Sequence, residues 1–240
     1  KPRIFLSGLS AIRIGYFIEK TVKASKSQYL LTTYEGHARE RIIFSSARKA
    51  NKNILCYAYQ HSILNKYQHS LTRNIENRFN PNHIFCCGKI TYDKLIEMKS
   101  LDSVGISILG SPKGLPIDNE IKLSFRNKNL TFLFLPEGQY SEYEIFFDLI
   151  LDCANLLPDH NFIWRSHPIM DLERLDIIEG ICLPKNLSIS CNALDDDLKA
   201  SDIAVYRGTT AVIRAVIANL VPIYIKTEGE IGIDIMHSLD

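Results

Sequence analysis

Short apolar runs alternate with amphipathic segments of helical period along this 240-residue chain. The runs expected to form strands are 28–33, 54–59, 83–87, 104–109, 130–135, 161–164, 187–191, 203–206 and 222–225. The segments expected to form helices are 12–24, 38–52, 92–99, 141–157, 194–200 and 209–219. Strands that alternate with helices in this way are typical of βαβ units, whose strands pair in parallel. The sequence therefore predicts an α/β protein built on parallel sheets.

The pattern is interrupted between residues 110 and 129, where glycines and prolines are followed by charged residues. Such a composition breaks regular structure and indicates a connection between domains. We expect two Rossmann-like domains, 1–115 and 116–240, facing a cleft towards which the carboxyl ends of both sheets point. The first segment is short for a complete Rossmann-like domain, so we expect that domain to be incomplete.

Composition and charge limit the partners of the chain. Its 46% apolar content is enough for a core, and its net charge of +1 predicts no bulk attraction to nucleic acid or to a membrane. The six cysteines lack the paired spacing of a zinc site or a disulfide framework, so no metal site is expected. No signal peptide or long apolar span is visible, which favours a cytoplasmic protein. The start at Lys1 indicates a piece of a longer polypeptide.

A histidine–proline pair follows the expected strand 161–164. Pro168 restricts the backbone of His167 to an extended geometry and so fixes the direction of the imidazole. We expect His167 to bond phosphate oxygens and to assist a departing phosphate, with Arg165 offsetting the charge. The alternatives are an ordinary loop histidine and a surface arginine.

A second polar motif follows the strand 203–206 and opens a helix. Gly208, Thr209 and Thr210 offer hydroxyl and backbone N–H groups at a place where the helix dipole favours a phosphate. Arg207 is expected to add positive charge, unless it is a surface residue. The two motifs together predict a nucleotide-phosphate crevice.

Two acidic residues, each followed by glycine, also stand after expected strands. The backbone amides around Gly138 are expected to hold a phosphate or a sugar, and Glu137 a ribose hydroxyl or a base amine; a simple turn is the alternative. Glu35, beside Gly36, is expected to act as a general base or nucleophile. The alternative for Glu35 is an interaction with the dipole of the following helix.

Three further groups stand near expected strand ends or helix starts. His37 and His61 also stand near strand ends and are possible substrate contacts or structural histidines. The acids 195–197 are typical of a metal cluster or, as we favour, of a helix N-terminus near residue 198. Ser141, with acidic residues after it, is expected to cap the helix 141–157.

The polar pairs occur in the order Glu35-Gly36, His167-Pro168 and Thr209-Thr210. This order resembles bacterial sialyltransferases and polysialyltransferases of GT-B fold, which carry an acidic-Gly motif, an HP motif and a Ser/Thr pair. It is also similar to the bacterial Kdo transferases of capsule and lipopolysaccharide synthesis. The resemblance covers most of the chain by motif order, with Tyr34 where many members have a second acid and Thr-Thr where serine is common.

The resemblance implies transfer of an acidic sugar, Kdo or sialic-acid-like, from a CMP-activated donor to a bacterial surface glycan or glycolipid. It assigns catalysis to Glu35 and His167, and it implies no cofactor beyond the CMP-sugar substrate. It places the protein in the cytoplasm, in peripheral contact with the inner membrane or with other domains. CDP-glycerol phosphotransferases carry similar motifs, and a non-catalytic module of the same fold is a further alternative.

Overall fold

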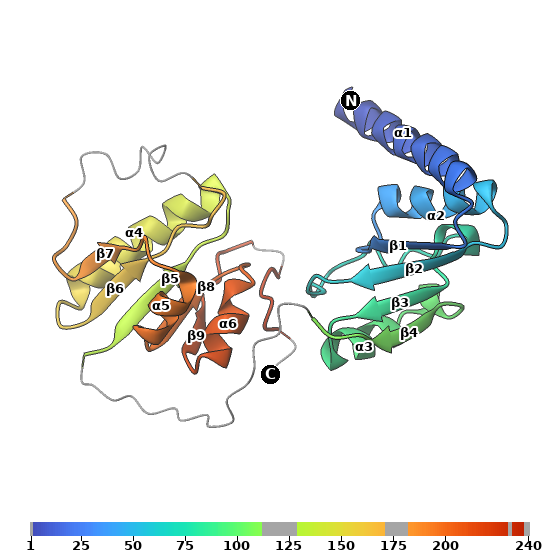
Figure 1. Ribbon diagram of the computed structural model, residues 1–240. Coiled ribbons are helices and arrows are strands. Elements are labelled where there is room, and N and C mark those ends of the chain that lie inside the picture. The colour runs from blue at the N-terminus through green and yellow to red at the C-terminus, as the bar shows by residue number, and fades with distance from the viewer. Residues whose placement is uncertain (1, 112–128, 171–181, 230–231, 238–240) are drawn as a thin grey trace. The chain divides into compact units, whose positions relative to one another are not determined.

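The computed structural model describes residues 2–111, 129–170, 182–229 and 232–237, without the side chains of residues 2–7. The chain divides into two compact units, Lys1–Gly114 and Leu115–Asp240, called here the first and second domains. Each described domain contains one sheet of parallel strands, as the alternating pattern predicts (Figure 1). Most of the expected interdomain connection, residues 112–128, lies outside the described residues.

The first domain has a four-stranded sheet in the order β1-β2-β3-β4. Its elements are α1 (Pro2–Ser25), β1 (Tyr29–Thr33), α2 (Ala38–Ala50), β2 (Leu55–Gln60), η1 (Asn77–Phe79), β3 (His83–Cys86), α3 (Lys89–Ile96), η2 (Lys99–Leu101) and β4 (Gly105–Ile108). Strands that follow one another in sequence are also neighbours in the sheet. Because parallel crossovers are right-handed, such an order places the connecting helices on one face.

That face carries the core of the first domain. Phe44 of α2 and Leu95 of α3 pack in one cluster with Cys56, Ala58 and other inward residues of the strands. α1 joins the cluster through Val22. All three helices therefore contribute to a single hydrophobic core on one side of the sheet.

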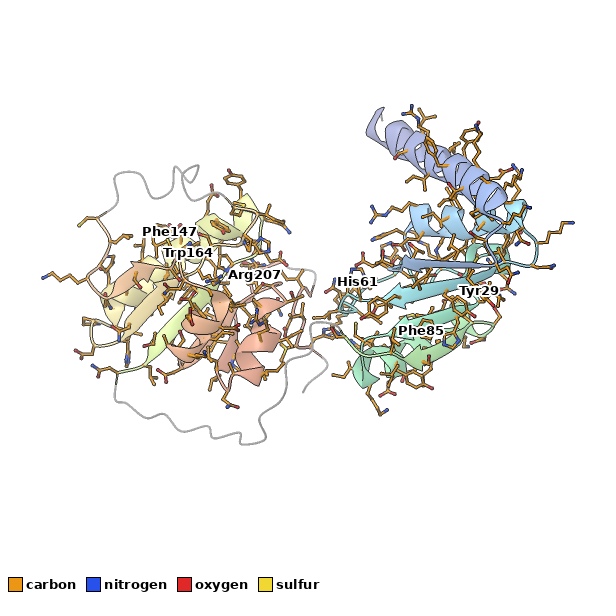
Figure 2. All side chains as sticks on the ribbon, viewed as in Figure 1. Tyr29, His61, Phe85, Phe147, Trp164 and Arg207 are labelled. Carbon is orange, nitrogen blue, oxygen red and sulfur yellow. The ribbon has the colours of Figure 1, made fainter. Side chains whose placement is uncertain are left out.

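The opposite face of this sheet is open among the described residues. Tyr29, Leu31 and Leu55 are 63%, 67% and 40% exposed, and they share this face with the half-buried rings of Tyr57 and Phe85. Tyr57 and Phe85 stack with their ring centroids 5.8 Å apart, and Figure 2 labels Tyr29 and Phe85 on the sheet. Parallel sheets are normally covered on both faces, so this open aromatic face is unusual.

The second domain has a five-stranded sheet in the order β7-β6-β5-β8-β9. Its elements are β5 (Thr131–Leu135), α4 (Tyr140–Leu156), β6 (Asn161–Trp164), β7 (Leu187–Ile189), α5 (Leu194–Lys199), β8 (Ile203–Tyr206), α6 (Ala211–Ile217) and β9 (Val221–Tyr224). From β5 the chain builds outwards through β6 and β7, and then crosses back to place β8 on the other side of β5. The topological switch point therefore lies between β5 and β8, where open α/β sheets bind ligands.

Aromatic side chains form the core between α4 and this sheet. Phe146 and Phe147 of α4 pack on Phe134 and Trp164, and both contacts are edge-to-face with ring centroids 6.0 and 5.3 Å apart. α5 and α6 lie on the other side of the sheet from α4 (Figure 1). The sheet of the second domain is thus covered on both faces.

The expectation that Ser141 caps its helix was wrong. Ser141 lies inside α4, because the N–H groups of Glu142 and Tyr143 already donate to the carbonyl of Gln139, which is the N-cap. The acids 195–197 lie in the first turn of α5, which begins at Leu194 as the expected range 194–200 predicts. Their place at a helix N-terminus is thus confirmed, although that helix does not begin near residue 198. Among the described residues, no helix is both long enough and apolar enough to cross a bilayer.

Replacing Phe146 by alanine is expected to lower the free energy of unfolding of the second domain by about 3–5 kcal/mol, because it leaves a cavity in a fully buried site. Leu156→Ala changes the same helix at a side chain that is 78% exposed, and its expected effect is within about 0.5 kcal/mol. Urea unfolding followed by the fluorescence of Trp164, the one tryptophan of the sequence, measures both. Equal losses in the two variants would contradict the core described above.

Candidate functional site

The polar motifs of the second domain come together at the carboxyl edge of its sheet. Glu137 and Gly138 follow β5, His167 follows β6, and Gly208 follows β8. These three strands are adjacent and parallel, so their carboxyl ends lie side by side. Glu137 and Gly208 stand on the two sides of the switch point.

Two glycines allow the motifs to approach one another closely. A Cβ at Gly208 would lie 1.9 Å from Oε1 of Glu137, and a Cβ at Gly138 would lie 2.8 Å from Nδ1 of His167. No side chain larger than hydrogen fits at either position unless its neighbour moves. The glutamate therefore rests against the backbone after β8, and the imidazole rests against the backbone after β5.

His167 is held in a defined orientation. Its backbone N–H donates to the hydroxyl of Tyr143 at 2.5 Å, and its Nδ1 accepts the N–H of Ile169 at 3.3 Å. With Nδ1 accepting, the proton of a neutral ring resides on Nε2, which makes Nε2 a donor. Burial raises the pKa of Tyr143, although its bonds to His167 and Ser166 oppose the shift. Tyr143 therefore stays a neutral phenol that anchors this turn.

Arg165 has an acidic partner inside the domain. Its Nη1 lies 2.6 Å from Oδ2 of Asp197 and also donates to the carbonyl of Asn192 at 2.7 Å. Asp197 is 1% exposed and also accepts from Ser190 at 2.7 Å. This buried carboxylate neutralises the guanidinium and fixes its position at the end of β6.

Arg207 is likewise engaged within the domain. It is 4% exposed, and its Nη1 lies 2.7 Å from Oε1 of Glu142 on α4. Its Nη2 donates to the hydroxyl of Thr227 at 3.0 Å. The structure thus gives Arg207 a role in joining α4 to the end of β8, where the sequence alone suggested a charge directed at a ligand.

The two threonines after β8 differ in exposure. Thr209 is 9% exposed, and its hydroxyl accepts the N–H of Ala211 at 3.3 Å. Thr210 is the exposed N-cap residue of α6, and its hydroxyl makes no capping bond. Thr209 therefore shapes the turn, and Thr210 presents its hydroxyl outwards.

Glu35 lies at the carboxyl edge of the sheet in the first domain, with His37 and His61. Its Oε2 lies 2.9 Å from Nε2 of His37, and Ser62 donates a further hydrogen bond to the carboxylate. Burial raises the pKa of Glu35, but the bonds from Ser62 and His37 and the nearby charge of His61 outweigh it, so the net shift is downwards. Glu35 is therefore ionised at neutral pH. The stability it contributes is present above the unfolded pKa and is lost as the pH falls through the folded pKa.

Capping of α2 is carried out by Glu40. Its Oε2 accepts the backbone N–H groups of both Glu35 and His37 at 2.9 Å. The carboxylate of Glu35 instead points to the two side chains named above. Glu40 stands three residues after the N-cap His37, which is the spacing of a capping box, so this signal was available in the sequence.

A buried arginine secures the loop that carries Glu35. Arg41 is 6% exposed and donates to the carbonyls of Gly36 and Ser70 and to Oδ1 of Asn80, at 3.0, 2.6 and 2.7 Å. Gly36 has a φ of +79°, and a Cβ there would lie 2.8 Å from the backbone of Ser70. No local pattern marked Arg41, because its partners are up to 39 residues away.

Metal ligation finds no support in the parts of the chain that the structure describes. No group of three or more His, Cys, Asp or Glu side chains there is placed to hold an ion. Of the acids 195–197, Asp195 pairs with Arg214 and Asp197 with Arg165.

Comparison with solved structures identifies the fold to which this arrangement belongs. No family profile and no curated protein matches the sequence. Among solved structures, the chain is similar to the glycotransferase of kitacinnamycin (TM-score 0.51, 11% identity, 87% of this chain and 59% of that one). It is also similar to the pneumococcal O-GlcNAc transferase GtfA in complex with UDP and GlcNAc (TM-score 0.50, 11% identity, 87% and 44%). A Listeria monocytogenes protein described as a UDP-N-acetylglucosamine 2-epimerase is similar as well (TM-score 0.52, 12% identity, 89% and 61%).

These similarities establish the fold. The chain is an α/β protein of GT-B type with two Rossmann-like domains, the first of them with a four-stranded sheet. It spans between 44% and 61% of the length of these three solved chains.

Replacing Glu40 by alanine is expected to destabilise the start of α2 by roughly 1–3 kcal/mol, because two backbone donors lose their acceptor. Glu35→Gln, five residues away, leaves those donors bonded and is expected to cost less than about 1 kcal/mol. Hydrogen–deuterium exchange of the amides of residues 35–44 measures both effects. Faster exchange in the Glu35 variant than in the Glu40 variant would mean that Glu35 is the capping residue.

Proposed function

We propose that this chain forms part of a glycosyltransferase that moves a sugar from a nucleotide-activated donor to a hydroxyl of a glycan or glycolipid acceptor. The fold supports this proposal, since two of the similar solved structures are of glycosyltransferases. In the proposal the second domain binds the nucleotide of the donor, and the first domain supplies the carboxylate of Glu35.

One observation carries the assignment of the second domain. Glu137 and Gly208 meet across the switch point, and His167 lies against Gly138 on the next strand end. An anionic ligand there would meet the Nε2 donor of His167 and the hydroxyl of Thr210. Because both arginines already have acidic partners, they would act mainly by holding these strand ends in place. The carboxylate of Glu137 would repel a phosphate, so its suitable partner is a ribose hydroxyl or a base amine.

For the donor we propose a CMP-activated acidic sugar, of the Kdo or sialic-acid kind. The support is the order of the acidic-Gly, HP and Thr-Thr motifs together with the placement of the last two at the carboxyl ends of β6 and β8, the strands on either side of β5. A CMP leaving group carries one phosphate, for which Nε2 of His167 and the hydroxyl of Thr210 are the proposed side-chain donors. A UDP-linked sugar is the competing donor, since GtfA was solved with UDP and GlcNAc.

For the first domain we propose that Glu35 removes the proton of the acceptor hydroxyl or attacks the donor as a nucleophile. Its lowered pKa keeps the carboxylate ionised, which both roles require. A low pKa also makes a weak base, so the adjacent imidazole of His37 is the alternative proton acceptor. His37 has a side chain that is 49% exposed, and Glu35 orients it through the 2.9 Å contact.

CMP at millimolar concentration is expected to raise the melting temperature more than UDP or GDP does, because binding to the folded state stabilises it. His167→Ala removes a hydrogen bond to a charged group and is expected to weaken CMP binding by about tenfold to a hundredfold. Ile169→Ala, at a side chain 79% exposed in the same turn, is the matched control and should keep wild-type affinity. Equal stabilisation by UDP would reassign the donor, and no stabilisation by any nucleotide would refute a nucleotide site.

Glu35→Gln is expected to abolish most transfer from a CMP-sugar while leaving CMP affinity unchanged, because it removes a group needed only in the transition state. Glu76→Gln, at a side chain 68% exposed in the same domain, is the control and should retain full activity. If Glu35 is the base, the acid limb of the activity profile falls below its ordinary pKa of 4.5. An active Glu35→Gln variant with a limb near pH 6.5 would instead assign the proton transfer to a histidine.

A further inference from the structure

α1 presents an outward face that combines apolar and basic side chains. Along its described turns, Leu9, Ile12, Tyr16 and Phe17 are 42%, 65%, 56% and 65% exposed. The basic residues on the same side of the helix are Arg13, Lys20 and Lys23, all exposed. Helical spacing places these seven residues, called here the outer face of α1, on one continuous stripe.

The orientation of this face is fixed by the packing of α1 on α2. α1 and α2 approach closely at Gly15, since a Cβ there would lie 2.7 Å from Oγ of Ser46 and 2.8 Å from Cγ2 of Ile42. Ala11 and Val22 are buried on the same side as Gly15. α1 therefore cannot rotate to bury Phe17 without losing this close contact, and Figure 1 shows α1 lying over α2.

The N-terminal segment that contains α1 is rich in cations. The first 53 residues contain eleven lysines and arginines against three acids, although the whole chain has a net charge of +1. The acid of the described part of α1, Glu19, is paired with Lys23 at 2.7 Å and with Lys49 at 2.9 Å. Lys20 lies 4.7 Å above the ring of Tyr16. An anionic partner would thus meet cations alternating with aromatic and aliphatic groups.

We propose that the outer face of α1 docks onto the surface of an anionic lipid bilayer. Interfacial helices combine these features: apolar and aromatic side chains enter the boundary between headgroups and acyl chains, while lysines extend to the lipid phosphates. Each cation near an anionic bilayer contributes about 1 kcal/mol, and buried apolar side chains add to this. A purely electrostatic partner such as nucleic acid would leave Ile12 and Phe17 without a role. Docking would hold the domain that carries Glu35 at a surface where lipid-linked acceptors are found.

The test is co-sedimentation of the 240-residue protein with vesicles of phosphatidylcholine alone or mixed with phosphatidylglycerol. We expect binding to the mixed vesicles and little to phosphatidylcholine. The double variant Arg13→Ala/Lys20→Ala should lose about fivefold in partition for each cation removed. Ile12→Ser/Phe17→Ser should lose about tenfold or more.

The control is Tyr29→Ser/Leu31→Ser, which removes two equally exposed apolar side chains from the open sheet face of the same domain. Its binding should match the wild type, and circular dichroism checks that all variants fold. Equal binding to both vesicle types, no binding, or an equal loss in the control would overturn the proposal. Competition by soluble heparin that is equally strong for the wild type and for Ile12→Ser/Phe17→Ser would also overturn the proposal, since that result would indicate a polyanion site. The readout involves no transfer activity, so it stands apart from the proposed function.

Discussion

Parallel pairing of β5 with both β6 and β8 is the constraint on which the second domain depends. It brings three strand ends to one edge of the sheet, and the backbone segments that follow these strands lie close together. The contacts of Gly208 with Glu137 and of Gly138 with His167 are the result. Side chains that are up to 71 positions apart in sequence become neighbours because each follows a strand of the same sheet.

Buried ion pairs then tie the helices to these strand ends. Glu142 on α4 holds Arg207 after β8, and Asp197 on α5 holds Arg165 after β6. Removing one partner of such a pair leaves a buried charge uncompensated, which costs far more than losing a surface pair. In the first domain Arg41 has a similar place but bonds to neutral oxygens. The loop that carries Glu35 is thus held in place by Arg41 and by neutral backbone and amide oxygens, which have no proposed role in catalysis.

The sequence predicted the strands well because a buried parallel strand is a short apolar run with clear ends. Asn161–Trp164 and Ile203–Tyr206 match the expected runs. Helix ends were less predictable: α1 extends back to Pro2, and prolines are favourable at the first position of a helix. The partners of Arg165 and Arg207 lie 32 and 65 positions away, so no local pattern could show that both charges are neutralised. Glu40 was predictable from its spacing to His37, whereas Ser62 became recognisable only once β1 and β2 were paired.

The first sheet has an edge at β1 in addition to its open face, and this edge bears on how copies of the protein behave together. Among the described strands, β1 has a neighbour on one side only, and it exposes Tyr29 and Leu31. An uncovered strand edge is a template for adding a strand from another molecule. With a net charge of +1, electrostatic repulsion does little to keep molecules apart in solution. A single lysine introduced on β1 would oppose such pairing, because a charge on an edge strand disfavours the addition of a second strand.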